Sequence, residues 1–212
     1  MIDNFKLIEP LFYFNESSNM FFYCQVVRRA KDHKPNKVSE SAIKTYFIRS
    51  KESLDKLKDE IVFLCEHYKA RAYINVSGKS FESVNKLMLY KLAEYNCITS
   101  LSNINPKKLL NNLVRDINSK NPRWVVDIDN ISLKDDIKDF LIKLWAESYH
   151  RTEEIIKAFL FDFIYAEIPT VNGLHFITKP FNTKEFRAKF PNVDVHKNSM
   201  GTLLYYPKSL ES

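Results

Sequence analysis

Short runs of apolar residues alternate with longer amphipathic segments along this chain, and the alternation predicts its strands and helices. Aromatic and β-branched residues are concentrated in Met20–Arg29 and Ile43–Arg49, as is typical of strands. The polar, lysine-bearing stretch between them predicts a hairpin with a basic tip. Further strands are predicted at Arg71–Val76, Trp124–Asp129, Tyr165–Ile168, Leu174–Thr178, near Val193 and at Leu203–Tyr206.

Helical spacing is clearest after Ser50, a residue type that is preferred at helix N-caps. The apolar residues that recur there at intervals of about three or four are Leu54, Leu57, Ile61, Leu64 and Cys65. The same reasoning predicts helices that begin at Ser80 and Ser132. Three more helices are predicted, over Lys107–Ile117, Thr152–Phe163 and Thr183–Phe190.

Strands and helices are interspersed along the whole chain, without an internal repeat or a low-complexity segment. We therefore expect an α+β fold with a mixed, largely antiparallel sheet flanked by helices. A chain of 212 residues can bury a substantial core as one domain. Residues 1–212 are therefore read as a single domain, with a candidate boundary between two lobes near Cys97–Pro106.

Composition narrows the class of protein. The chain has 32 Lys and Arg against 26 Asp and Glu, a net charge of +6 that favours polyanionic partners. Cys24, Cys65 and Cys97 are scattered without a Cys-x-x-Cys pair, which argues against a structural zinc site. The first residues, Met1-Ile2-Asp3-Asn4-Phe5-Lys6, lack the charged-then-apolar order that is typical of a secretory signal. The longest apolar stretch, Ala158–Ile168, is too short and too charged to span a bilayer. These features predict a cytoplasmic protein without membrane contact.

The first candidate for chemistry is a pair of carboxylates, Asp127 and Asp129, at the end of an apolar run. Residues two apart on a strand point to the same face, with Cα atoms about 6.6 Å apart. Two carboxylates so placed could hold a pair of Mg²⁺ or Mn²⁺ ions. The plain structural alternative is a solvated strand end, which is common for an isolated Asp-x-Asp.

Two further polar residues lie on apolar segments downstream. His175 follows Asn172-Gly173, where a glycine would let a phosphate approach the backbone, and Lys179 could bind the same phosphates. Asp194 could supply a third carboxylate to the metals. A lone histidine on an apolar strand is often a structural residue with its hydrogen bonds satisfied, so this alternative stays open.

The order of these groups resembles the catalytic core of the archaeo-eukaryotic primase superfamily, which includes primase small subunits and primase-polymerases. Val126-Asp127-Ile128-Asp129 matches the family's hydrophobic-Asp-hydrophobic-Asp motif. Thr170-Val171-Asn172-Gly173-Leu174-His175 matches Ser-Gly-x-Gly-x-His, with Thr in place of Ser and Val171 in place of the first Gly. Val193-Asp194 matches the hydrophobic-Asp motif that follows.

The resemblance implies a primase-polymerase core that makes or extends a primer by two-metal phosphoryl transfer. It implies that two divalent ions, Mg²⁺ or Mn²⁺, are bound by Asp127, Asp129 and Asp194. The incoming NTP or dNTP would be held by Thr170, Asn172, His175 and Lys179. The implied partners are a single-stranded DNA template and a replicative helicase or another primase subunit.

Basic residues of the predicted hairpin are candidates for template binding, because single strands bind through charge and through stacking on aromatic rings. They are Arg28, Arg29, Lys31, Lys34 and Lys37, with Arg71 and Lys79 further along the chain. Two other classes of function remain open. One is a non-catalytic single-stranded nucleic-acid-binding replication protein with the same fold, and the other is a metal-dependent phosphodiesterase or nuclease. The catalytic interpretation predicts that the three aspartates and His175 meet in one cleft.

Overall fold

The structure is a computed structural model that describes residues 1–14, 19–33, 40–98, 104–119, 121–149, 163–197 and 201–210. Its strands are β1 (Ile2–Asp3), β2 (Met20–Arg28), β3 (Ser41–Ile48), β4 (Arg71–Asn75), β5 (Lys79–Ser80), β6 (Trp124–Ile128), β7 (Ile164–Pro169), β8 (Leu174–Thr178), β9 (Asp194–His196) and β10 (Gly201–Tyr206). Its α-helices are α1 (Phe5–Ile8), α2 (Lys51–Tyr68), α3 (Phe81–Ile98), α4 (Pro106–Asp116), α5 (Lys134–Tyr149) and α7 (Thr183–Lys189). Short 3₁₀ turns include η2 (Ala30–His33) and η4 (Ile131–Leu133).

The first sheet is built from both ends of the chain. Its strand order is β1-β10-β4-β2-β3, with β5 on β2, and every pairing is antiparallel. Burial alternates along β2, so that Phe22, Cys24 and Val26 face one side while Phe21 faces the other. The first side packs against α2 through Leu54 and other residues, and the second packs against α3 and α4.

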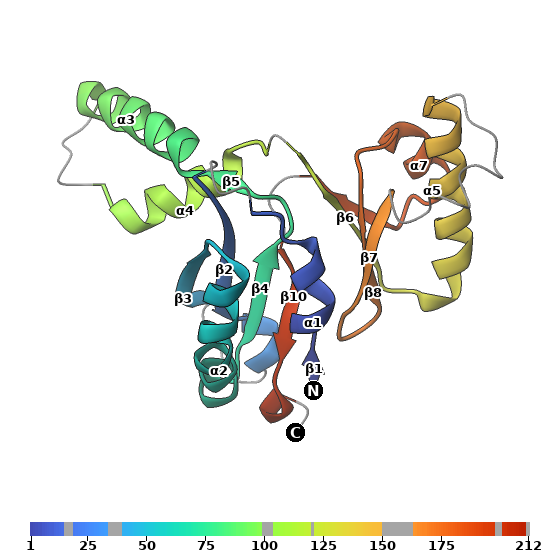
Figure 1. Cartoon of the computed structure of the whole chain (residues 1–212), viewed down its shortest axis with the longest axis horizontal. Coiled ribbons are helices and arrows are strands. Elements are labelled where there is room, and N and C mark those ends of the chain that lie inside the picture. Colours follow the sequence, from blue (N-terminus) through green and yellow to red (C-terminus); the bar gives the residue numbers. More distant parts are fainter. Residues whose placement is uncertain are drawn as a thin grey trace.

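The second sheet has the order β7-β8-β6-β9, again with every pairing antiparallel. In chain order the described elements run β6, α5, β7, β8, α7, β9, which is the split βαβ arrangement with β6 and β8 in the centre. Val126, Ile128 and Phe176 of the central strands are buried in one cluster with residues of α5 and α7. The two helices therefore cover the face of this sheet that points away from the first sheet (Figure 1).

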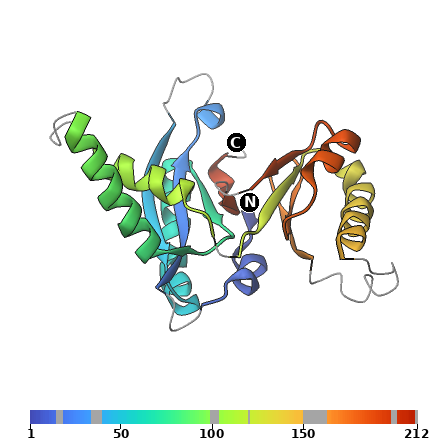
Figure 2. The same ribbon diagram turned by 90° about the horizontal axis from the view of Figure 1, so that it is seen from above.

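The other face of the second sheet meets the first. Val125 and Ile177 of its central strands share a core with Ile74 and Leu204 of the first sheet. After β9 the chain returns as β10 and inserts between β1 and β4. The sheets thus form two lobes side by side (Figure 2), and β1 and β10 lie on the side of the first sheet nearer the second lobe (Figure 1).

The predicted α+β class is confirmed, with antiparallel sheets flanked by helices. The hairpin of β2 and β3 is present, and Ser50 caps α2 by accepting a hydrogen bond of 3.1 Å from the Ser53 amide. The predicted helix start at Ser132 is wrong: the side chain of Asn130 accepts from the Ser132 amide, a 3₁₀ turn follows, and α5 begins at Lys134.

Two predicted segments lie wholly or partly outside the described residues, namely the helix over Thr152–Phe163 and the lobe boundary near Cys97–Pro106. In the described residues the chain passes from the first lobe to the second between α4 and β6. Among all the residues that the structure describes, no helix is long and apolar enough to cross a membrane.

Candidate functional site

A row of polar residues crosses the second sheet on the face opposite its helices. Asp127 of β6 is paired directly with His175 of β8 on one side and with Asp194 of β9 on the other. Directly paired residues of antiparallel strands point to the same face, and the flanking Val126 and Ile128 point into the core under α5 and α7. Strand register therefore brings together three of the predicted site residues.

His175 connects the two sheets. Its Nε2 lies 3.3 Å from Oδ1 of Asp127, and its Nδ1 lies 2.9 Å from the hydroxyl of Thr202 on β10. His175 is only 4% exposed and Thr202 is fully buried. An imidazole that donates to the carboxylate through Nε2 accepts the hydroxyl proton at Nδ1, so both ring nitrogens are engaged within the protein. The histidine thereby fixes the orientation of the Asp127 carboxylate.

The hydrogen bond from His175 lowers the pKa of the Asp127 carboxyl below its ordinary value of 3.8, although partial burial opposes this effect. Positive charge nearby, including that of Lys31, acts in the same lowering direction. Asp127 is consequently an ionised carboxylate at neutral pH, which is the form that binds cations.

Asp129 follows β6 directly and is exposed. The turn between β7 and β8 lies against it: a Cβ built on Gly173 would be 1.9 Å from the carbonyl oxygen of Ile128 and 2.9 Å from Cα of Asp129. Thr170 closes this turn, because its amide donates to the carbonyl of Gly173 and its hydroxyl accepts from the Gly173 amide at 3.1 Å. Gly173 thus has a packing role that sets the position of the turn beside the carboxylates.

These residues line one side of a cavity of about 150 Å³ between the two sheets, called here the small cavity. Its acidic wall consists of Asp127, Asp129, Thr170, Asn172 and His175. Its basic wall consists of Arg29, Lys31, Arg71 and Tyr73 from the first sheet and the adjoining turn. Carboxylates that face cations across a gap suit a ligand that is itself anionic and carries metal ions, as nucleotide phosphates do.

The basic wall is held by contacts between distant segments. Arg71 donates from Nε to Oδ2 of Asp32 at 2.7 Å, and this ion pair is nearly buried, with side chains 11% and 6% exposed. The Arg71 guanidinium also lies over the ring of Tyr206. Arg29 donates to the hydroxyl of Tyr73 at 2.9 Å. Arg71 is thus committed to the fold, while Lys31, in the 3₁₀ turn η2, carries its charge close to Asp127.

Other predicted residues lie elsewhere. Asp194 is exposed beside Asp127 and does not line the small cavity. Lys179 lies 5.9 Å from the ring of Trp145 on the helix-covered side. Arg28 donates to the carbonyl of Tyr68, also outside the cavity. Lys34 and Lys37 fall outside the described residues.

Sequence reasoning missed Asp32, Tyr73 and Thr202, which support the site rather than carry its motifs. Asp32 lies 39 residues before its partner and Thr202 lies 27 residues after His175. No local spacing signals such contacts, because the first arises only when β2 and β4 are paired and the second only when β10 lies against the second sheet.

The carboxylates are chemically suited to Mg²⁺ or Mn²⁺ held jointly with a phosphate. Within the described residues, no three His, Cys, Asp or Glu side chains converge closely enough to hold an ion by themselves. Mg²⁺ does not need such a cage, because it is commonly bound by one or two carboxylates together with waters and substrate phosphates. Asp127 and Asp129 line one cavity, and Asp194 stands next to Asp127 on the same face of the sheet.

Comparisons of the chain with protein-family models, curated protein sequences and solved structures find no match.

Proposed function

We propose that the chain is a metal-dependent nucleotidyltransferase of the primase-polymerase type, acting on a single-stranded DNA template. The observation that carries the proposal is the direct register of Asp194, Asp127 and His175 on three adjacent strands. Beside this row, Asp127 and Asp129 face Arg29 and Lys31 across the small cavity. A site with only a structural role would have little reason to place carboxylates opposite cations, and among the described residues no ion pair joins Asp127 or Asp129 to Arg29 or Lys31.

In this proposal Asp127, Asp129 and Asp194 hold two divalent ions, which would neutralise phosphate charge and favour ionisation of the attacking hydroxyl. Arg29 and Lys31 bind the outer phosphates from the basic wall, and Thr170 and Asn172 border the cavity on the acidic wall. The 3′-hydroxyl attacks the α-phosphate, so that a new P–O bond forms while the bond to pyrophosphate breaks and the hydroxyl proton leaves to solvent.

The contacts of His175 favour a positioning role over direct binding of the triphosphate. Both of its ring nitrogens already have partners in the protein, and it is nearly buried. Its contribution is to hold the Asp127 carboxylate in one orientation and to lower its pKa.

A non-catalytic single-stranded nucleic-acid-binding protein is the second candidate. The observation in its favour is the position of Asp194, which is exposed and outside the small cavity. This candidate shares the basic wall but gives the carboxylates no chemical role.

The test measures incorporation of labelled NTPs or dNTPs on a single-stranded DNA template with Mg²⁺ or Mn²⁺. Asp127→Asn keeps the shape of the side chain but removes its charge, and we expect product to fall by at least about a hundredfold. Asp139→Asn is the matched control, because Asp139 is an exposed aspartate of α5, the helix that covers the opposite face of the same sheet. A native chain that makes no product, yet binds single strands as well as Asp127→Asn does, would favour the non-catalytic candidate.

A further inference from the structure

A second and larger cavity, of about 450 Å³, lies between the first sheet and α4. We infer that this large cavity binds an unpaired nucleobase together with a neighbouring phosphate. The inference deepens the proposed function, on which it rests for the identity of the nucleotide being joined. A volume of 450 Å³ is in the range of ordinary ligand pockets, whereas the 150 Å³ of the small cavity falls below that range.

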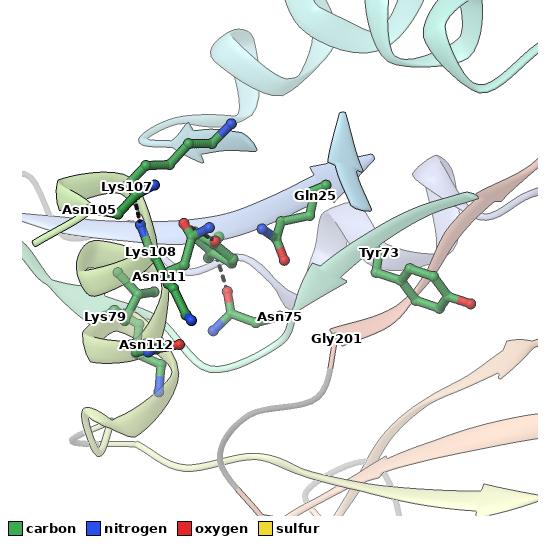
Figure 3. Close-up of a pocket in the computed structure, with 13 residues that line it drawn as sticks. Gln25, Tyr73, Asn75, Lys79, Asn105, Lys107, Lys108, Asn111, Asn112 and Gly201 are labelled. Atoms are coloured by element: carbon green, nitrogen blue, oxygen red, sulfur yellow. Dashed lines mark hydrogen bonds between the residues drawn. The ribbon is translucent and has the colours of Figure 1, made fainter. Parts of the chain in front are cut away.

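Carboxamide side chains dominate the lining of the large cavity. Gln25, Asn75 and Asn111 gather between the strands and α4 (Figure 3). A carboxamide carries both a donor and an acceptor, which is the combination that pairs with the edges of nucleobases. Asn75 is held at both ends, because its Oδ1 accepts from the main-chain N–H of Tyr23 and its Nδ2 donates to the carbonyl of Ser77. Gln25 donates from Nε2 to the Thr45 hydroxyl at 3.2 Å, so its Oε1 and the Nδ2 of Asn111 are the groups suited to reading a base.

An aromatic ring borders these amides. The hydroxyl of Tyr23 donates to Oδ1 of Asn111 at 2.7 Å, and the main-chain N–H of Tyr23 donates to Oδ1 of Asn75 at 2.6 Å. These bonds fix two of the amides and the ring relative to one another. Unpaired bases bind proteins by stacking on such rings while their edges form hydrogen bonds.

The charge of the lining fits a phosphate. Lys107 and Lys108 line the cavity, and no Asp or Glu does so among the residues that the structure describes. Lys79 also lines it, but its side chain is buried and its Nζ donates to the carbonyl of Ile117. Lys107 and Lys108 are exposed in the first turn of α4, which has no acidic residue there. The dipole of a helix disfavours cations at its N-terminus, so these two lysines do not stabilise α4. They are well placed to bind an anion there.

The two cavities adjoin. Tyr73 lines both, and β10 contributes Gly201 to the large cavity and Leu203 to the small one. A nucleotide seated in the large cavity would therefore lie next to the carboxylates. Two sources of the base share this chemistry, namely a base of the single strand and the base of the incoming nucleotide.

Binding in EDTA tests the inference without any catalysis. Fluorescence anisotropy would compare a labelled ten-nucleotide oligothymidine with an abasic strand of equal length, and competition by dTTP would report on the free nucleotide. We expect the wild type to prefer the strand with bases by about tenfold or more, and Asn111→Ala to lose most of that preference. If the base comes from the incoming nucleotide, Asn111→Ala weakens dTTP binding instead. Asn96→Ala, an exposed amide on α3 outside the cavity, is the matched control.

The contribution of Lys107 and Lys108 is measured separately, through the salt dependence of binding. Lys107→Ala/Lys108→Ala should weaken both strands alike and lower the slope of log K against log salt by about 0.7 for each phosphate that is no longer neutralised. Lys56→Ala/Lys143→Ala removes the same charge from exposed positions on α2 and α5. Circular dichroism melting would establish that each variant is folded.

Unchanged binding of both the strand and dTTP in folded Asn111→Ala and Lys107→Ala/Lys108→Ala would overturn the inference. This outcome is separate from a failure of the proposed function, which is judged by nucleotide incorporation. Loss of base preference in Asn111→Ala, in a protein that makes no product, would keep the nucleobase site and leave the non-catalytic candidate.

Discussion

The two walls of the small cavity are built in different ways. The acidic wall depends on the second sheet, where pairing of β6 with β8 brings Asp127 and His175 together within one layer. The basic wall depends on side chains, because the nearly buried bond between Asp32 and Arg71 ties the turn after β2 to the start of β4. A wall fixed by backbone register should tolerate changes of polar side chains, whereas a wall fixed by an ion pair should not.

The largest effect is expected on the basic wall. Asp32→Ala would leave the guanidinium of Arg71 nearly buried without its partner, at a cost of about 3–5 kcal/mol in the free energy of unfolding. Asp32→Ala/Arg71→Met removes both charges and should recover most of that loss. Urea denaturation of the two variants measures the difference.

A surface pair provides the control for this prediction. Lys44 and Glu60 form an ion pair with side chains 47% and 40% exposed, so Glu60→Ala should cost no more than about 1 kcal/mol. If Asp32→Ala costs as little as Glu60→Ala, the pair between Asp32 and Arg71 does not hold the basic wall.

Backbone packing should be the sensitive point of the acidic wall. Gly173→Ala would place a Cβ 1.9 Å from the carbonyl oxygen of Ile128, so the turn must move away from β6, at about 1–3 kcal/mol. Gly78→Ala is the control, since its Cβ would meet the terminal methyl of Met20, which can move aside. Thermal unfolding should show a clear drop in Tm for Gly173→Ala only. Equal drops in both variants would argue against close packing at Gly173.

A smaller effect is expected where the sheets meet. Thr202→Val removes the hydroxyl that bonds to the buried His175, which should cost about 1–3 kcal/mol. Thr178 is a fully buried threonine whose hydroxyl has no hydrogen-bond partner within the described residues. Thr178→Val should therefore leave the free energy of unfolding unchanged or raise it. Both variants replace the same hydroxyl by a methyl group, so the difference between their free energies of unfolding, measured in denaturant, reports on the hydrogen bond. Equal free energies of unfolding would show that the hydrogen bond of Thr202 contributes nothing.

The sequence could predict features that local patterns determine, but not contacts between distant segments. Alternation in Val126-Asp127-Ile128-Asp129 predicts a strand with Asp127 on the face opposite Val126 and Ile128, and this strand is present. The direct pairing of Asp127 with both His175 and Asp194 follows from local patterns only once the register is known. The Asp32 bond and the Thr202 contact could not be predicted, because the first depends on the pairing of β2 with β4 and the second on the return of β10 to the first sheet. The large cavity could not be predicted either, because its side chains come from separate segments of the sequence.

The smallest effect concerns the pH dependence of stability. Asp127 has a lowered pKa in the folded state, so its charged form stabilises the fold at pH values above its ordinary pKa of 3.8. That contribution is lost as the pH falls below 3.8 and through the folded pKa, because the unfolded chain binds the proton more readily. Asp127→Asn has no such proton to bind, so its free energy of unfolding should fall less steeply than that of the wild type on the acid side of 3.8. Urea melts at a series of pH values measure both slopes. Parallel curves would mean that His175 does not stabilise the Asp127 carboxylate, and the positioning role given to this histidine would then be wrong.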